Sequence, residues 1–182
     1  MPRHGDAGRV RLLAMDVDGV LTDGGLYMGQ DIELKRFCVQ DGLGLRLAAL
    51  AGIALAWISG RESVAVRGRA AELGDIQLFE GVQDKRLVVE RLAHSLNLDF
   101  EDIGFIGDDL NDLPVMRCCG WACAPSNAAP MVRLEAHYVC TAAGGHGAVR
   151  EACELILGAQ RTLDRAINDY LTMYRAEPFT AM

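Results

Sequence analysis

Two aspartates, Asp16 and Asp18, follow the first apolar segment of the chain, in the sequence Met-Asp-Val-Asp-Gly-Val. A carboxylate at the end of a strand, with a second one two residues later, places two acidic groups near one point. One group can attack phosphorus and form an aspartyl-phosphate, while the other donates a proton to the leaving oxygen and then activates water. Such a pair also suits Mg²⁺, which prefers carboxylates, waters and phosphate oxygens. Taken alone, the short pattern is more typical of a turn with solvated acids.

A second acidic segment, Gly-Asp-Asp-Leu-Asn-Asp at residues 107–112, follows another short apolar run. Three carboxylates within five residues repel one another unless a cation or a hydrogen-bond network neutralises them. We expect Asp108 to bind Mg²⁺ directly. Asp109 and Asp112 are expected to hold waters of the ion, to orient a lysine, or to cap a helix that begins near Asn111.

Two further polar residues stand at the ends of apolar segments. Ser59 precedes Gly60 in Trp-Ile-Ser-Gly-Arg, where its hydroxyl and neighbouring backbone N–H groups can hold phosphate oxygens. The alternative is an ordinary helix cap. Lys85 opens a helical pattern, where a cation opposes the helix dipole. Unless it is a solvated surface lysine, it serves to balance the aspartates and a transferring phosphoryl group.

The elements that must position these residues alternate along the chain. Short apolar segments predict strands at residues 11–17, 53–58, 76–79, 103–106, 121–124 and 138–140. Helical patterns lie between and after them, at residues 43–50, 62–73, 85–96, 112–118 and 147 to about 174. The alternation predicts an α/β fold, a Rossmann-like three-layer sandwich with a mainly parallel sheet and helices on both faces.

Residues 24–39 break this alternation, because two short, partly alternating runs flank a Gly-Gln-Asp turn. They predict a β-hairpin flap that projects over the carboxyl end of the first strand, where open α/β sheets bind ligands. A chain of 182 residues is expected to form one domain, with a core at about 9–160 and a helical tail at about 161–182. The tail carries apolar residues at helical spacing: Leu163, Ile167, Tyr170, Leu171 and Tyr174.

The composition narrows the classes of function. The net charge is −7, without a long run of either sign, which argues against a surface that binds nucleic acid through bulk positive charge. The first eight residues lack the apolar stretch of a signal peptide, and no segment is apolar enough to span a bilayer. We therefore expect a cytoplasmic protein. The six cysteines form no Cys-x-x-Cys pair and are expected to be reduced, mostly buried thiols.

The order of Asp16 and Asp18, Ser59, Lys85 and Asp108 along the chain resembles that of the haloacid dehalogenase-like (HAD) phosphatases. In that family the first aspartate is the nucleophile and the second is the acid and base. Mg²⁺ is also bound there by the main-chain carbonyl of the second aspartate and by the later aspartate. Asp at the second position, where transport ATPases of the superfamily carry Thr, implies a phosphatase rather than a pump.

The resemblance covers about residues 12–160 and is to capless members, since the chain leaves no room for a large cap domain. It implies an open site that another subunit covers, in a homotetramer. Four segments jointly resemble members that hydrolyse eight-carbon keto-sugar-acid phosphates for lipopolysaccharide synthesis. They are DVDGVLTDG from Asp16, FCVQDGLG from Phe37, ISGR from Ile58 with Arg69-Ala, and GGHGAVRE from Gly144.

Relatives that act on nine-carbon sugar acids carry Glu at the position of Arg61. Arg61 and Arg69, eight residues apart on one predicted helix, are therefore candidates to bind a substrate carboxylate, also in a neighbouring subunit, or else are exposed helix arginines. His146 and Arg150 are further candidates in a glycine-rich segment that is otherwise a mobile lead-in to the last helix. The alternatives are a nine-carbon or other sugar-phosphate phosphatase, a phosphotransferase, and a non-catalytic assembly module.

Overall fold

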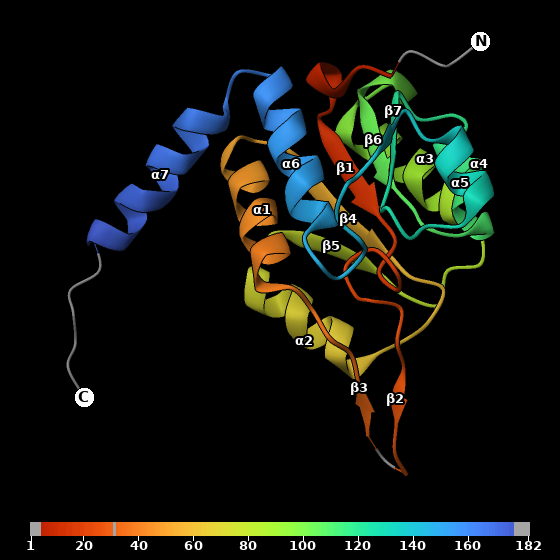
Figure 1. Cartoon of the computed structure of the whole chain (residues 1–182). Coiled ribbons are helices and arrows are strands. Elements are labelled where there is room, and N and C mark those ends of the chain that lie inside the picture. The colour runs from red at the N-terminus through yellow and green to blue at the C-terminus, as the bar shows by residue number, and fades with distance from the viewer. Residues whose placement is uncertain (1–4, 31, 177–182) are drawn as a thin grey trace, which may run out of the picture.

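A computed structural model describes the chain over residues 5–30 and 32–176. Its centre is a parallel six-stranded sheet with the strand order β5-β4-β1-β6-β7-β8 (Figure 1). The strands are β1 (Leu12–Met15), β4 (Ala54–Ile58), β5 (Ile76–Phe79), β6 (Ile103–Ile106), β7 (Trp121–Ala124) and β8 (Tyr138–Val139). The predicted α/β fold class is therefore confirmed, and all six predicted strands are present.

Helices cover both faces of the sheet, because successive side chains of each buried strand point to opposite sides. Leu13 and Met15 of β1 pack into one core with α1, α2, α6 and α7, whereas Leu12 and Ala14 pack into the other with α3, α4 and α5. The helices are α1 (Val39–Leu50), α2 (Val64–Leu73), α3 (Lys85–Leu96), α4 (Leu113–Met116), α5 (Pro130–Glu135), α6 (Ala148–Ala159) and α7 (Leu163–Ala176). Single 3-10 turns are η1 (Ala7–Arg9), η2 (Phe100–Asp102) and η3 (Leu110–Asp112).

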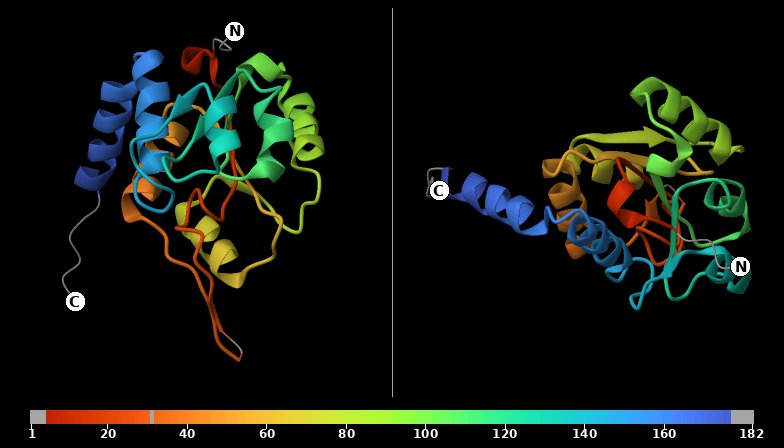
Figure 2. Two further views of the ribbon diagram at one scale, coloured as in Figure 1. Left: turned by 45° about the vertical axis from the view of Figure 1, so that its right-hand side comes forward. Right: turned by 90° about the horizontal axis from the view of Figure 1, so that it is seen from above.

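The expected long helix from residue 147 to about 174 is wrong, because the chain breaks it into α6 and α7. Arg161 adopts a left-handed conformation with φ of 57°, and the side chain of Gln160 donates to the carbonyl of Val10 at 2.7 Å. These contacts turn the chain so that α7 diverges from α6 (Figure 2). The turn at residues 160–162 contains neither Gly nor Pro, the usual helix breakers. The helical spacing of apolar residues continues across it, and the sequence therefore predicts one long helix.

The tail helix α7 packs on the body of the molecule through part of its apolar stripe. Leu163, Ile167 and Tyr170 contact the core of α1 and α6, whereas Leu171 is 48% exposed. The rest of the predicted tail, residues 177–182, lies outside the described residues. No helix in the described ranges is long and apolar enough to cross a membrane.

The predicted hairpin consists of β2 (Tyr27–Met28) and β3 (Glu33–Leu34), which pair antiparallel. A bridge between Thr22 and Phe37 closes its base. The hairpin projects from the end of the sheet toward which the β1 arrow points, as Figure 1 shows. It therefore stands at the carboxyl edge of the parallel strands, where the candidate residues of the site lie.

Candidate active site

The site lies where the sheet topology reverses. The chain runs from β1 outward through β4 and β5, and then returns to place β6 on the other side of β1. The two connections leave β1 and β6 in opposite directions, and open α/β sheets bind ligands at the carboxyl ends of strands beside such a reversal. Asp16 directly follows β1 and donates its N–H to the carbonyl of Ile106 at 3.0 Å, while Asp108 lies two residues beyond β6.

Lys85 joins the two acidic segments. It is the first residue of α3, and its side chain is only 2% exposed. Its ammonium lies 2.8 Å from Oδ1 of Asp16 and 2.7 Å from Oδ1 of Asp112. Burial lowers the pKa of Lys85, but the carboxylates of Asp112 and Asp16 outweigh it, so the pKa is raised overall. The structure thus places this lysine against Asp16 as a permanent cation.

Asp112 uses both carboxylate oxygens within the protein. Besides the contact of Oδ1 with Lys85, Oδ2 accepts the N–H groups of Asp108 at 2.9 Å and Asp109 at 3.3 Å. Gly107 allows this close approach, because a Cβ there would lie 2.5 Å from the Cβ of Asp112. Asp112 therefore orients the lysine and shapes the loop that presents Asp108.

The other two residues predicted around Asp108 take outer positions. The carboxylate of Asp109 accepts the N–H of Leu110 at 2.7 Å and caps the turn η3. Asn111 is exposed on that turn. Both therefore belong to the support of the loop rather than to the buried cluster.

The carboxylates of Asp16, Asp108 and Asp112 carry more negative charge than Lys85 balances. Each offers an oxygen, and these oxygens lie within 4.8 Å of one another. Burial, followed by the charges of Asp16 and Asp112, raises the pKa of Asp108 to about 8. Burial and the charge of Asp112 raise the pKa of Asp16 to about 6, against the opposing effects of Lys85 and the N–H of Val17.

A divalent cation fits this cluster. Among the described residues, Oδ1 of Asp108 is buried and has no hydrogen-bond partner, although a buried carboxylate oxygen normally has one. Hard oxygen donors of this kind are what Mg²⁺ prefers. The donor set and the unbalanced charge of the cluster thus both favour Mg²⁺ at Asp16 and Asp108.

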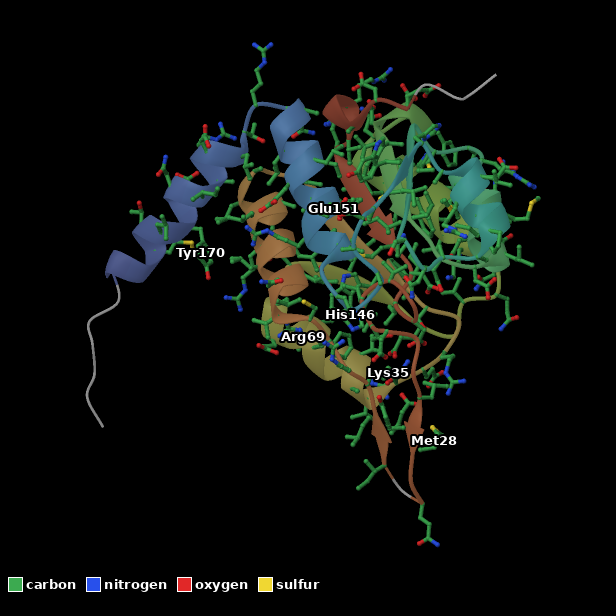
Figure 3. The ribbon with its side chains drawn as sticks, in the orientation of Figure 1. Met28, Lys35, Arg69, His146, Glu151 and Tyr170 are labelled. Carbon is green, nitrogen blue, oxygen red and sulfur yellow. The ribbon has the colours of Figure 1, made fainter. Side chains whose placement is uncertain are left out.

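Asp18 faces a lysine that the sequence analysis did not identify. The ammonium of Lys35 lies 2.6 Å from Oδ1 and 2.8 Å from Oδ2 of Asp18, and the Lys35 side chain has 0% exposure. Lys35 comes from the return arm of the hairpin, as Figure 3 shows. The hairpin was predicted to lie over the strand end, and this was the one signal for a hairpin cation near Asp18.

Ser59 and Gly60 follow β4 at the same edge of the sheet. The hydroxyl of buried Ser59 accepts the N–H of Arg61 at 3.1 Å, and its carbonyl accepts the N–H of Val82 at 3.0 Å. Ser63, not Ser59, stands at the N-terminus of α2. The helix-cap alternative for Ser59 therefore does not apply.

Arg61 and Arg69 do not share a helix, because α2 begins only at Val64. The guanidinium of Arg61 pairs with Glu33 of the hairpin at 3.4 Å. The guanidinium of Arg69 pairs with Glu72 at 2.7 Å and packs against Gly42 of the neighbouring helix α1 (Figure 3). Within the described chain, both arginines have carboxylate partners outside the cluster of Asp16.

The glycine-rich segment before α6 packs directly on the loop that follows Asp18. Gly144 and Gly145 are buried, and the N–H of Gly145 donates to the carbonyl of Val20 at 3.0 Å. A Cβ at Gly144 would lie 1.7 Å from the carbonyl oxygen of Gly19. The mobile lead-in that we considered is thus a tightly packed wall of the site.

His146 and Arg150 flank this wall. His146 contacts the carbonyl of Gly144 through Nδ1 at 2.9 Å and Arg36 through Nε2 at 3.0 Å. Arg150 pairs with Glu154 at 2.6 Å, and its backbone N–H donates to buried Asp41 at 2.8 Å. His146 thus contacts Arg36 at the base of the hairpin.

Comparison with known proteins gives consistent matches. Residues 69–151 match the sequence profile of the haloacid dehalogenase-like hydrolases. The 3-deoxy-D-manno-octulosonate 8-phosphate phosphatase KdsC of Salmonella typhi is 45% identical over 161 residues, which cover 88% of this chain and 86% of that protein.

Solved structures show the same similarity. The 3-deoxy-D-manno-octulosonate 8-phosphate phosphatase of Yersinia pestis superposes with a TM-score of 0.85 at 44% identity, covering 87% of this chain and 86% of its own. The enzyme of that name from Moraxella catarrhalis, in complex with a magnesium ion, a phosphate ion and KDO, gives a TM-score of 0.87 at 42% identity. That match covers 91% of this chain and 95% of the other.

Proposed function

The chain belongs to the haloacid dehalogenase-like hydrolases, and we propose that it is the phosphatase of 3-deoxy-D-manno-octulosonate 8-phosphate. It would release 3-deoxy-D-manno-octulosonate and phosphate, in the synthesis of a lipopolysaccharide precursor. The observation that carries the proposal is the meeting of Asp16, Lys85 and Asp108 at the carboxyl ends of β1 and β6, in a chain 45% identical to KdsC over most of its length.

We assign the metal to Asp16, Asp108 and the main-chain carbonyl of Asp18. Asp112 stays outside this set, since Lys85 and two N–H groups already occupy its oxygens. When bound, Mg²⁺ neutralises charge on the phosphoryl group and orients it for displacement.

The first half of the reaction transfers the phosphoryl group to the protein. A carboxylate oxygen of Asp16 forms a bond to phosphorus while the bond from phosphorus to the sugar oxygen breaks. Asp18 donates a proton to that oxygen. Lys85, the Ser59 hydroxyl and the Gly60 N–H stabilise the charge on the remaining phosphoryl oxygens.

The second half releases phosphate. Asp18, now a carboxylate, takes a proton from a water molecule as that water attacks phosphorus. The bond between phosphorus and Asp16 breaks, and the original carboxylate is restored. Because Asp18 is 24% exposed, water reaches it from outside without a movement of the sheet.

The homotetramer and the cytoplasmic location remain part of the proposal. Without a large cap domain, the hairpin is the element that covers the strand ends, and its apolar side chains have no cover in the described chain. They are Leu26, Tyr27, Met28, Ile32 and Leu34, each 42–66% exposed. Contiguous apolar surface of this kind favours contact with further subunits. The six cysteines form no disulfide within the described residues, which suits a reducing compartment.

A phosphate-release panel tests the function. We expect the Mg²⁺-loaded protein to prefer 3-deoxy-D-manno-octulosonate 8-phosphate over nine-carbon keto-sugar-acid phosphates and simple sugar phosphates. Asp16→Asn should abolish release from all of them. Asp164→Asn, at an exposed position on α7, is the matched control and should leave release unchanged. A preference for nine carbons, or full activity of Asp16→Asn, would overturn the proposal.

A further inference from the structure

The basic side chains around the hairpin are mostly paired with carboxylates. The pairs, with the cation named first, are Lys35 and Asp18, Lys85 and Asp16 with Asp112, Arg61 and Glu33, Arg67 and Glu80, Arg69 and Glu72, and Arg150 and Glu154. A carboxylate beside a guanidinium or ammonium offsets its positive charge, so its attraction for a second carboxylate is weaker. These arginines are therefore poorly placed to receive an acidic substrate.

Arg36 differs from them. Its contacts in the described chain are a hydrogen bond to the carbonyl of Gly145 and a contact with Nε2 of His146, each at 3.0 Å. Both are made by Nη1, and neither partner is a carboxylate. A guanidinium has five N–H donors in a planar fork. The donors on Nη2 and Nε thus have no partner among the described residues, and Arg36 is exposed.

His146 and Gly145 fix the direction of this fork. Since the carbonyl of Gly144 can only accept, Nδ1 of His146 carries the proton at their 2.9 Å contact. In the neutral ring, Nε2 is then an acceptor, which suits the N–H of Arg36. Two acceptors therefore hold one end of the guanidinium and leave the other end free to bind.

The position of Arg36 relates it to the reacting groups. Its neighbour Lys35 contacts Asp18, and its partner Gly145 is bonded to Val20, two residues beyond Asp18. Arg36 thus stands at the rim of the site, between the hairpin and the glycine-rich wall. Figure 3 shows Lys35 and His146 close to the base of the hairpin.

We propose that Arg36 binds the carboxylate of the sugar-acid substrate and so determines specificity, with His146 as the residue that positions it. The proposal rests on the proposed function, since it concerns the acidic end of that substrate. The paired N–H groups of an arginine fork match a carboxylate in a bidentate geometry. Arg61, which was the candidate from the sequence, instead holds the hairpin through Glu33.

The test compares two substrates in the Mg²⁺-loaded protein: 3-deoxy-D-manno-octulosonate 8-phosphate and arabinose 5-phosphate, a sugar phosphate without a carboxylate. For Arg36→Ala we expect KM for the sugar acid to rise about 10- to 100-fold, as for the loss of a charged hydrogen-bond pair. Its kcat, and both constants for arabinose 5-phosphate, should stay within about threefold. Arg36→Lys should restore part of the affinity, and His146→Ala should show a smaller rise.

Arg117→Ala, an exposed arginine between α4 and α5, is the matched control and should change neither substrate. Two results would overturn the proposal: an unchanged KM for the sugar acid in Arg36→Ala, or equal losses on both substrates in Arg36→Ala and Arg36→Lys. Failure of the proposed function is separable, because it shows in the unmodified protein as a lack of preference for the sugar acid.

Discussion

Asp16, Asp108 and Asp112 share one ammonium, that of Lys85, and this imbalance controls the chemistry of the site at the residue scale. An isolated group of three buried carboxylates would be neutralised by protonation. The raised pKa values of Asp16 and Asp108 express this tendency. A cation removes it, and the carboxylate of Asp16 is then available as a nucleophile at neutral pH.

The pKa of Asp108 makes the stability of the metal-free protein depend on pH. Its value of about 8 lies above the ordinary 3.8, so between these limits the folded state binds more protons than the unfolded state. The stability that protonated Asp108 contributes to the folded state is therefore fully present below pH 3.8 and is lost as the pH rises from there through about 8. In EDTA, we expect the protein to unfold at a lower temperature at pH 8 than at pH 5.5, with Mg²⁺ restoring stability at pH 8.

Thermal unfolding of Asp108→Asn in EDTA checks this cause. The variant should lose part of the pH dependence and should be more stable than the unmodified protein at pH 8, because the buried charge is gone. Asp164→Asn, at an exposed position on α7, is the control and should keep the full dependence. Equal pH slopes in Asp108→Asn and the unmodified protein would show that another group is responsible.

The candidate residues that follow strands could be found from the sequence, whereas Lys35 and Arg36 could not. Strand ends are marked by local apolar runs, so the positions of Asp16 and Asp108 at strand ends can be predicted from the residues next to them. The roles of Lys35 and Arg36 depend on contacts with Asp18 and with the glycine-rich wall, which are distant in sequence. Nothing local distinguishes them from surface charges.

At the scale of elements, the loop after β1 is held between the hairpin and the glycine-rich wall. On one side Lys35 donates a hydrogen bond to Asp18 of the loop, and on the other the N–H of Gly145 donates to the carbonyl of Val20. Neither support lies in the sheet itself. The alternating pattern predicts the sheet and its helices, but the fixation of this loop depends on the close packing of two irregular segments.

Gly144→Ala tests the role of the glycine-rich wall. A methyl group there would overlap the carbonyl of Gly19, so the loop that carries Asp18 must shift. We expect kcat to fall by more than about tenfold, as misplacement by about 1 Å can cost a factor of 100. The variant should also lose stability, measured by thermal unfolding.

Gly158→Ala is the matched control, because nothing lies within 4 Å of an added Cβ there and the residue is inside α6. It should be stabilised by about 0.5–1 kcal/mol through helix propensity and should keep its activity. Full activity of Gly144→Ala would show that the wall does not position the loop.

The break between α6 and α7 and the short helix α5 mark where the sequence analysis failed at this scale. A residue such as Arg161 adopts a left-handed conformation only because tertiary contacts on both sides fix it. Helix α5 has six residues, too few for a periodic pattern, and it forms where Val132 is buried against β7. Tertiary packing decides both features, and local pattern does not record it.

At the scale of the whole molecule, the strand order explains why residues far apart in sequence meet. The alternation of strands and helices predicts a parallel sheet, but not which strands are neighbours. The order found here places β6 beside β1 and brings Asp108 to Asp16 across 92 residues of chain (108 − 16 = 92). The resemblance to the haloacid dehalogenase-like phosphatases predicts that proximity, because it implies that both aspartates belong to one site.

The central claim is that Asp16 carries the phosphoryl group, and trapping of that intermediate tests it most directly. In Asp18→Asn the water that releases phosphate lacks its base, so the intermediate should persist. p-Nitrophenyl phosphate is the suitable substrate, since its leaving group departs without a proton.

Acid quenching within the first turnover, followed by peptide mass spectrometry, locates the phosphate. We predict one equivalent of p-nitrophenol per site in a burst, and phosphate on the peptide that contains Asp16. Phosphate on any other residue, or continued turnover of Asp18→Asn without a phosphorylated peptide, would contradict the account.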